Sequence, residues 1–235
     1  MRFGLFRPTV FVLLLGGGVV IALFVAIEAR HSDPILDISL FRSGGFAGTT
    51  VAAFSSGAGV LALMTLVPTL LGRAMGAGAL VAAFVLCAWS ATSVLTAFAA
   101  RWLPESWKPR WLLAGSLLAC AAAQLALLAP GTGGMALRLL PGLFLAGAAN
   151  GVLNAALGRQ AVETVPADRT AMGSGANNTA RYLGSAIGIT IGAVLIAHGE
   201  EVGGAAGLIE GWNAAVITTV AFSVLGAGLA LFARD

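Results

Sequence analysis

The chain has 235 residues, of which 58% are hydrophobic and only 10% charged, and its formal net charge is +3. A soluble domain carries about 25% charged residues, so this composition excludes an ordinary soluble globular protein. The charges gather in short gaps between long uncharged stretches, as expected when lipid surrounds most side chains. The small positive excess forms no basic stripe with interleaved aromatic residues, so we expect no nucleic-acid partner.

Seven apolar stretches are long enough to cross a bilayer core, which takes about 20 helical residues. A backbone in lipid must satisfy its own hydrogen bonds, and these runs do not alternate as barrel strands do, so α-helices are expected. We therefore predict an all-α, polytopic membrane protein of about seven transmembrane helices. In chain order the predicted spans are 9–27, 46–71, 78–100, 111–128, 135–157, 173–197 and 213–233.

The first predicted span could be mistaken for a secretory signal, because Arg2 and Arg7 precede its apolar run. However, the run is long for a signal, no small-x-small cleavage site follows it, and Glu28 and Arg30 close it. We therefore expect the segment to remain as a helix.

The basic residues divide unequally between the two sides of the predicted membrane. Four lie on one side (Arg2, Arg7, Arg73 and Arg138), together with Glu200, Glu201 and Glu210. Nine lie on the other: Arg30, Arg42, Arg101, Lys108, Arg110, Arg159, Arg169, Arg181 and Arg234. The positive-inside rule then predicts a multi-pass protein of the plasma (inner) membrane with a cytoplasmic C-terminus and an external N-terminus. Arg2 and Arg7 oppose this orientation, which suggests that Met1 is not the natural start of the polypeptide.

Three stretches carry a family resemblance: EARHSDPILDISLFR at 28–42, LPGLFLAGAANGVLNAALG at 140–158 and VPADRTAMGSGANNTARYLGSAIGITIG at 165–192. Together they resemble the C-terminal half of the major facilitator superfamily, in its fourteen-helix drug–proton antiporter branch. The matching residues are Glu28, Arg30, Pro34, Asp37, Leu40, Phe41, Arg42, Val165, Pro166, Gly173, Asn178, Arg181, Gly184 and Gly188.

The resemblance covers the whole chain as family helices eight to fourteen. It implies a linker-type transmembrane helix at 1–30, a cytoplasmic link at 31–43 and a C-terminal six-helix transporter bundle at 44–235. It further implies proton-coupled efflux of small hydrophobic or cationic molecules by alternating access, without enzymatic activity or a cofactor. The N-terminal half, with its loop motif and antiporter motif, is missing and becomes an expected partner. The link RWLPESWKPR at 101–110 resembles the family's basic loop only weakly.

Glycines recur at four-residue spacing, as the pair Gly147 and Gly151 and the series Gly184, Gly188 and Gly192. Small residues at this spacing allow helix backbones to approach closely. The simpler interpretation is static packing. The functional interpretation is that smooth contacts permit rocking during alternating access.

Asn150 and Asn154 are four residues apart and share a helical face. A polar side chain within a span needs a partner or a wet cavity. They therefore form interhelical hydrogen bonds or line the substrate path. By the resemblance, their helix and the second span line a cavity, which adds Ser55, Ser56 and Thr65 as candidates.

Arg181 and Asn178 enter the sixth predicted span within a polar stretch. Arg181 is either an anchor that snorkels to the cytoplasmic surface or a gate contact that pairs with an acid in one conformation. Asp168 and Glu163, in the preceding loop, are candidate partners.

All ten acidic residues lie at span ends, in loops or at the C-terminus. A proton-coupled carrier usually needs a buried carboxylate, so the proton carrier is expected in the missing half. The alternative function is a truncated or regulatory membrane component with no independent transport. A retinal protein is disfavoured because the only lysine, Lys108, lies in a loop. The spans hold no catalytic His/Asp/Glu cluster, and the isolated His31 and His198 suggest no metal site.

Overall fold

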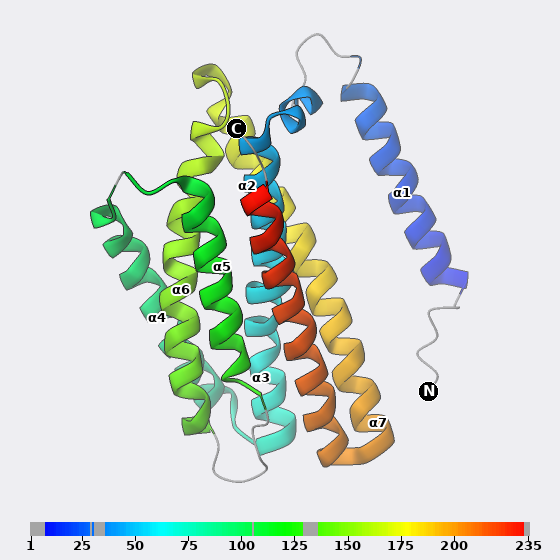
Figure 1. Cartoon of the computed structure of the whole chain (residues 1–235). Coiled ribbons are helices and arrows are strands. Elements are labelled where there is room, and N and C mark those ends of the chain that lie inside the picture. The colour runs from blue at the N-terminus through cyan, green and yellow to red at the C-terminus, as the bar shows by residue number, and fades with distance from the viewer. Residues whose placement is uncertain (1–7, 29, 31–35, 105, 129–135, 233–235) are drawn as a thin grey trace. The chain divides into compact units, whose positions relative to one another are not determined.

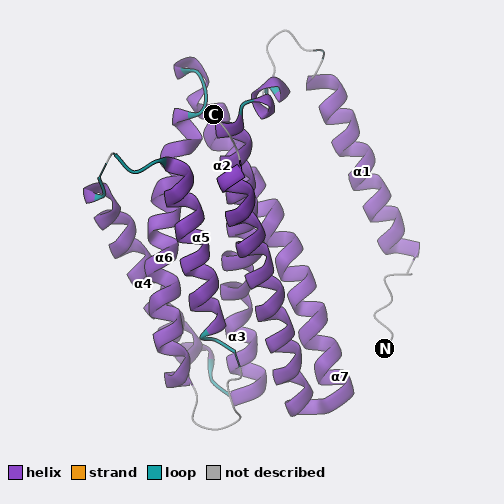
Figure 2. Cartoon of the chain, viewed as in Figure 1, coloured by secondary structure: helices purple, strands orange, loops and turns teal. Residues whose placement is uncertain are grey.

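The computed structural model describes residues 8–28, 30, 36–104, 106–128 and 136–232, and throughout these residues the regular structure is helical (Figures 1 and 2). This confirms the predicted all-α class. The α-helices are α1 (Pro8–Glu28), α2 (Gly44–Ser56), α3 (Ala62–Met75), α4 (Ala79–Ala99), α5 (Pro109–Leu125), α6 (Ala136–Glu163) and α7 (Thr170–Phe232). Short 3-10 turns lie at Ile38–Arg42, Ala100–Trp102 and Ala167–Arg169. The chain forms two compact units, residues 1–42 and 43–235.

The first unit contains α1, whose 21 residues are apolar except for Thr9 and Glu28. A helix that is apolar all round suits lipid. At its end, a Glu28 carboxylate oxygen accepts a hydrogen bond from the Leu36 amide, at 3.2 Å.

In the second unit, α2 and α3 form one continuous helical span from Gly44 to Met75. Ser43 caps its start, since its hydroxyl accepts a hydrogen bond from the Phe46 amide at 3.2 Å. The span continues through Pro68 and ends at Gly76, whose φ of 61° is the left-handed conformation that favours glycine. Between α2 and α3 lies a π-helical turn, Gly57–Leu61. A π-turn holds one more residue than an α-turn and changes the face that the following residues present.

Helix α7 folds back on itself at Gly204, whose φ is 59°. Its two arms touch beside this turn, where a Cβ added at Gly199 or Gly207 would collide with the backbone of the other. The last two predicted spans, 173–197 and 213–233, fall on these two arms.

The described residues include four helices long and apolar enough to cross a membrane: Gly44–Met75, Ala79–Trp102, Leu137–Glu163 and Ala167–Phe232. Helix α5, with 17 residues, and the apolar segment Leu15–Glu28 are shorter. Large apolar side chains face outward, including Leu80 and Phe84 on α4, which are 77% and 75% exposed. Such a surface is stable in lipid rather than in water, so the chain is a multi-pass membrane protein.

Two helices organise the bundle. Helix α6 packs against α4 and α5, whereas α7 packs against α2, α3 and α5. Trp212 is fully buried on the second arm of α7, and its indole N–H donates to the Leu127 carbonyl at 2.9 Å. This bond pairs the indole of a fully buried tryptophan, whereas the buried Trp89 indole nitrogen, Gln124 amide nitrogen and Asn177 amide oxygen have no hydrogen-bond partner within the described residues.

Candidate functional site

Asn150 joins α6 to α4. Its side-chain amide donates a hydrogen bond to the Ser93 hydroxyl at 2.9 Å, and both residues are buried. A buried polar pair of this kind fixes two helices in one register. The structure thus places Asn150 in an interhelical hydrogen bond; sequence reasoning named Asn150 but not its partner Ser93.

Asn154, one turn further along the same face of α6, joins α6 to α7. Its side-chain oxygen accepts a hydrogen bond from a terminal guanidinium nitrogen of Arg181 at 2.6 Å. A guanidinium carries five N–H donors, so this bond uses only part of its capacity. Within the described part of the chain, no carboxylate lies within ion-pair distance of Arg181. The Asn154–Arg181 pair therefore retains donors for a further acceptor.

Arg181 leaves α7 deep in the bundle. Its backbone carbonyl lies against Gly57, where an added Cβ would collide with it. Gly57 is 13 residues after Gly44, or about 20 Å along the helix. The side chain reaches from this depth to Asn154, and long helical side chains lean toward their own N-terminus. Arg181 and Asn154 are half-buried, and their hydrogen bond offsets part of the cost of holding a charge among helices.

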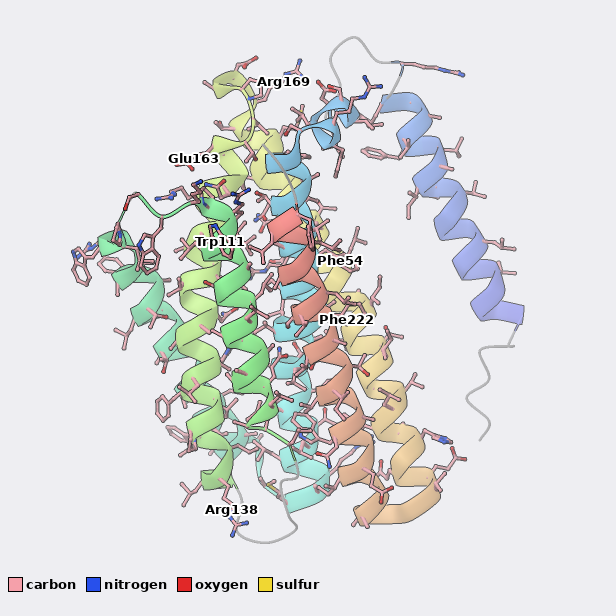
Figure 3. The ribbon with its side chains drawn as sticks, viewed as in Figure 1. Phe54, Trp111, Arg138, Glu163, Arg169 and Phe222 are labelled. Carbon is pink, nitrogen blue, oxygen red and sulfur yellow. The ribbon has the colours of Figure 1, made fainter. Side chains whose placement is uncertain are left out.

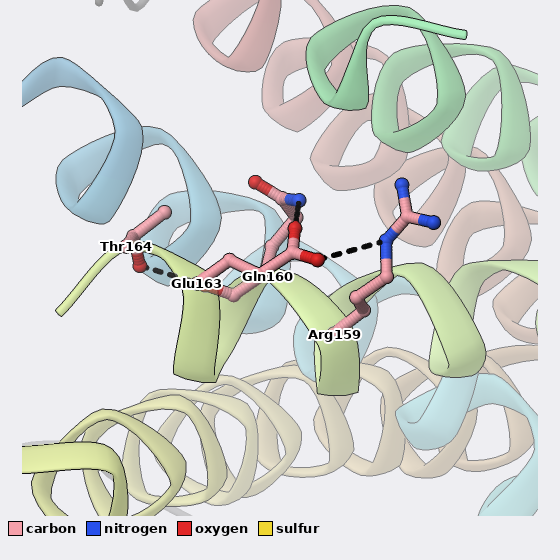
Figure 4. A network of polar contacts seen from close by, with 4 residues as sticks. All are labelled: Arg159, Gln160, Glu163 and Thr164. Carbon is pink, nitrogen blue, oxygen red and sulfur yellow. Dashed lines mark hydrogen bonds and ion pairs between the residues drawn. The ribbon is translucent and has the colours of Figure 1, made fainter. Parts of the chain in front are cut away.

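The two acids predicted as gate partners lie elsewhere in this conformation. Glu163, at the end of α6, accepts a hydrogen bond from the Gln160 amide at 2.6 Å and pairs with the Arg159 side chain at 3.5 Å (Figure 4). Asp168 is exposed in the turn that precedes α7, and Asn178 is exposed on α7. The gate role of Arg181 stays a prediction that concerns a second conformation.

The three predicted hydroxyl candidates occupy different environments. Ser55 is buried against α7, where a Cβ added at Gly226 would collide with it, and Ser56 is buried as well. Thr65 is exposed on α3, and its hydroxyl donates to the Leu61 carbonyl at 2.8 Å. Thr65 is thus the only one of the three that is exposed in this conformation.

The glycine series on α7 lies against α2, the π-turn and α3. A Cβ at Gly184 would come within 3.0 Å of the Ala58 amide nitrogen, and one at Gly188 within 2.6 Å of the Ala62 side chain. Gly192 faces Leu66 in the same way. Backbone therefore packs almost directly on backbone at Gly184 and Gly188, whereas Gly192 packs against a side chain.

The pair Gly147 and Gly151 makes a similar approach between α6 and α4. A Cβ at Gly147 would lie 3.0 Å from the Thr92 side chain, and one at Gly151 2.7 Å from the Ala97 amide nitrogen. Here the neighbouring surface carries hydroxyl groups, including Thr92 and Thr96, whose side chains donate to carbonyls of their own helix.

The π-turn was not anticipated from the sequence. Its Gly59 faces the second arm of α7, where an added Cβ would lie 2.9 Å from the Thr219 carbonyl oxygen. Gly57 faces the first arm, so the turn lies between both arms. The sequence Gly57-Ala58-Gly59 within an apolar run was the available signal of such close approach.

This geometry defines the protein as a helical membrane bundle whose helices are joined by polar pairs and glycine contacts. The sequence model of the Major Facilitator Superfamily matches residues 8–189 and, in an overlapping match, residues 49–235. The chain therefore belongs to the major facilitator superfamily. The family consists of membrane transporters, which points to transport rather than to enzymatic activity.

The chain is similar to YvkA of Bacillus subtilis (strain 168), described as an uncharacterized MFS-type transporter. The two are 25% identical over 211 residues, which make up 90% of this chain and 44% of the relative. The chain thus spans about half the length of this curated relative.

Proposed function

We propose that the chain acts as the C-terminal half of a proton-coupled exporter of drugs or other small hydrophobic or cationic molecules. Family membership and the 44% coverage of the relative support this assignment. The structural observation that carries it is the Asn154–Arg181 pair. This pair places a guanidinium with unused hydrogen-bond donors between two helices of the bundle. In a carrier, such a group can change its hydrogen-bond partner from one conformation to the next.

Alternating access requires one bundle to rock against another around a central site. In this proposal Thr65 and Asn154 contribute to the substrate path. Arg181 bonds Asn154 in one state and a carboxylate, either Glu163, Asp168 or an acid of the other bundle, in the second state. The glycine contact of α7 with α2 and α3 permits the small displacements that such a change needs.

The proton carrier is assigned to an N-terminal half. Among the described residues, the carboxylates of the second unit lie toward helix ends and turns: Glu163 ends α6, Asp168 precedes α7, and Glu200, Glu201 and Glu210 flank the turn at Gly204. A carboxylate must lie in a dry interior for its proton affinity to rise enough to carry protons.

The proposed orientation places the end of the bundle that holds Glu163 and Arg169 in the cytoplasm, opposite the end that holds Arg138 (Figure 3). Five basic residues lie in the first or last turns of helices, or in the segments beside them, at the first end, and two at the second: Arg101, Lys108, Arg110, Arg159 and Arg169 against Arg73 and Arg138. The positive-inside rule favours this orientation.

The test is efflux of a fluorescent cationic dye from cells that lack their main exporters. Cells would produce the chain alone, or the chain with an N-terminal half encoded beside it. We expect efflux only with both halves, its loss on addition of a protonophore, and a strong reduction by Arg181→Gln. Arg138→Gln, which removes an equal charge at the opposite end, should leave efflux unchanged. Efflux that is absent with both halves, or insensitive to Arg181→Gln, would contradict the proposal.

The second candidate is a membrane component without transport of its own. It is favoured because half of a two-bundle carrier supplies only one wall of the cavity. This candidate predicts that the chain alters efflux by another carrier while Arg181→Gln has no effect.

A further inference from the structure

An apolar groove lies along α5 and α6, next to Leu103 and residues 106–108, which precede α5. Helices α5 and α6 pack against each other, and both contribute side chains to the groove. The groove has a volume of about 730 Å³. Ala149 and Val152 of α6 form its floor, and Gly115 and Ala119 of α5 lie along its wall.

The groove reaches from the end of the bundle to the middle of the membrane. Ala119 lies ten residues after Pro109, the first residue of α5, which corresponds to about 15 Å of helix. This depth is about half of the hydrocarbon core of a bilayer, or one leaflet. The length of the groove therefore matches one acyl chain that enters from the leaflet at this end.

Tryptophan side chains line the mouth of the groove, and an arginine stacked on aromatic rings lies two residues before Leu103, which also lines it. Trp107 and Trp111 line it and are 50% and 60% exposed, and Figure 3 shows Trp111 at the start of α5. Arg101 lies on the rings of Phe98 and Trp102, with its guanidinium carbon 4.3 and 4.6 Å from their centres. Tryptophan rings with neighbouring cations are typical of the level of lipid head groups.

Lys108 lines the groove and also a smaller pocket of about 240 Å³ on the other side of the α5 start. Arg110 and Gln160 contribute to the smaller pocket. Lys108 and Arg110 form no ion pair among the residues that the structure describes, and Glu105 lies outside them. The Glu163 carboxylate near Gln160 is engaged by Gln160 and Arg159. Among the described residues, Lys108 and Arg110 thus have no ion-pair partner at the mouth of the groove.

We propose that this groove binds an anionic phospholipid, whose head-group phosphate lies at Lys108 and Arg110 and whose acyl chain lies along α5 and α6. A phospholipid suits both parts of the site, because its acyl chain fits the apolar groove and its phosphate fits the basic mouth. Basic pockets between membrane helices favour anionic head groups in this way. The inference does not depend on transport activity or on which side of the membrane is the cytoplasm.

The test uses the full chain in phosphatidylcholine nanodiscs, with tryptophan quenching by added brominated phosphatidylglycerol or brominated phosphatidylcholine. We expect stronger quenching by phosphatidylglycerol at equal content. Lys108→Gln should weaken the apparent affinity for phosphatidylglycerol about fivefold, whereas Arg138→Gln at the opposite end should not change it. Equal quenching by the two lipids, or an unchanged preference in Lys108→Gln, would overturn the proposal.

A second pair of variants tests the apolar part. Gly115 lines the groove with open space beside it, so Gly115→Leu should fill the groove and reduce quenching by either brominated lipid. Gly158 on α6 also has open space but lies outside the groove, and Gly158→Leu should have no effect. Equal behaviour of the two leucine variants would contradict the acyl-chain assignment. Excess inorganic phosphate should not displace the lipid, and displacement would assign the basic mouth to a free anion instead.

Discussion

Two close helix contacts in the bundle use glycine at four-residue spacing, yet they differ in how they are held. The contact of α6 with α4, at Gly147 and Gly151, contains the buried Asn150–Ser93 hydrogen bond. The contact of α7 with α2 and α3, at Gly184 and Gly188, is lined by backbone and small apolar groups.

The difference separates a fixed contact from a smooth one. A buried hydrogen bond sets a single register, because a shifted helix would leave both partners unpaired. Backbone packed on backbone has no such directional constraint, although it is very sensitive to added volume. We expect the α4–α6 contact to move as a unit and the α7 contact to allow displacement.

The largest predicted effect comes from adding one methyl group to the α7 contact. Gly57→Ala would place its Cβ against the Arg181 carbonyl and 2.8 Å from the Ser185 amide nitrogen. Since backbone cannot yield as a side chain does, we expect a loss of about 3 kcal/mol in unfolding free energy. The measurement is reversible unfolding in detergent.

Gly72→Ala is the matched control for this substitution. Gly72 is an exposed position on α3, where an added methyl group would meet only open space. Alanine is also the better helix former, so stability should stay equal or rise slightly. If both variants behaved alike, the α7 contact would be looser than the structure indicates.

A smaller effect is expected from the hydrogen bond in the fixed contact. Asn150→Ala should cost about 1 kcal/mol, because it removes the bond and leaves the Ser93 hydroxyl buried. A double-mutant cycle with Ser93→Ala measures the coupling directly, and we expect about 0.6 kcal/mol. Strictly additive effects would mean that the bond does not fix α6 to α4.

The smallest effect concerns the ion pair between α3 and α7 at the far end of the smooth contact. Arg73 and Glu200 are 2.8 Å apart, with side chains 54% and 41% exposed. Exposed pairs contribute little, so a cycle with Arg73→Gln and Glu200→Gln should give a coupling below about 1 kcal/mol that declines with salt. A salt-insensitive coupling of about 2 kcal/mol would show that this ion pair fixes the α7 contact in one register.

The sequence predicted where helices cross the membrane better than where they end. Helix α6 continues past the predicted end at 157 to Glu163, and α7 continues through Glu200 and Glu201 to the turn at Gly204. Hydropathy detects where lipid ends, whereas glutamate and alanine sustain a helix in water. Conversely, α5 ends at Leu125, before the predicted 128, although the following residues are still apolar.

The candidate site was predictable only in part, and for a physical reason. Helical periodicity places Asn150 and Asn154 on one face. Their partners, Ser93 and Arg181, are 57 and 27 residues away along the chain and lie on two different helices. Such pairings depend on how helices rotate against one another, which a single apolar sequence leaves open because lipid accepts any apolar face.

The π-turn at Gly57–Leu61 contains one residue more than a regular α-helical turn would. In an α-helix each residue turns the chain by about 100°, so one extra residue rotates all later side chains by that amount. Ser55, before the turn, meets Gly226 on one arm of α7, whereas Leu66, after it, meets Gly192 on the other. Deletion of Ala58 would restore a regular helix and misalign one of these contacts, so this segment should tolerate substitution by small residues far better than any change in its length.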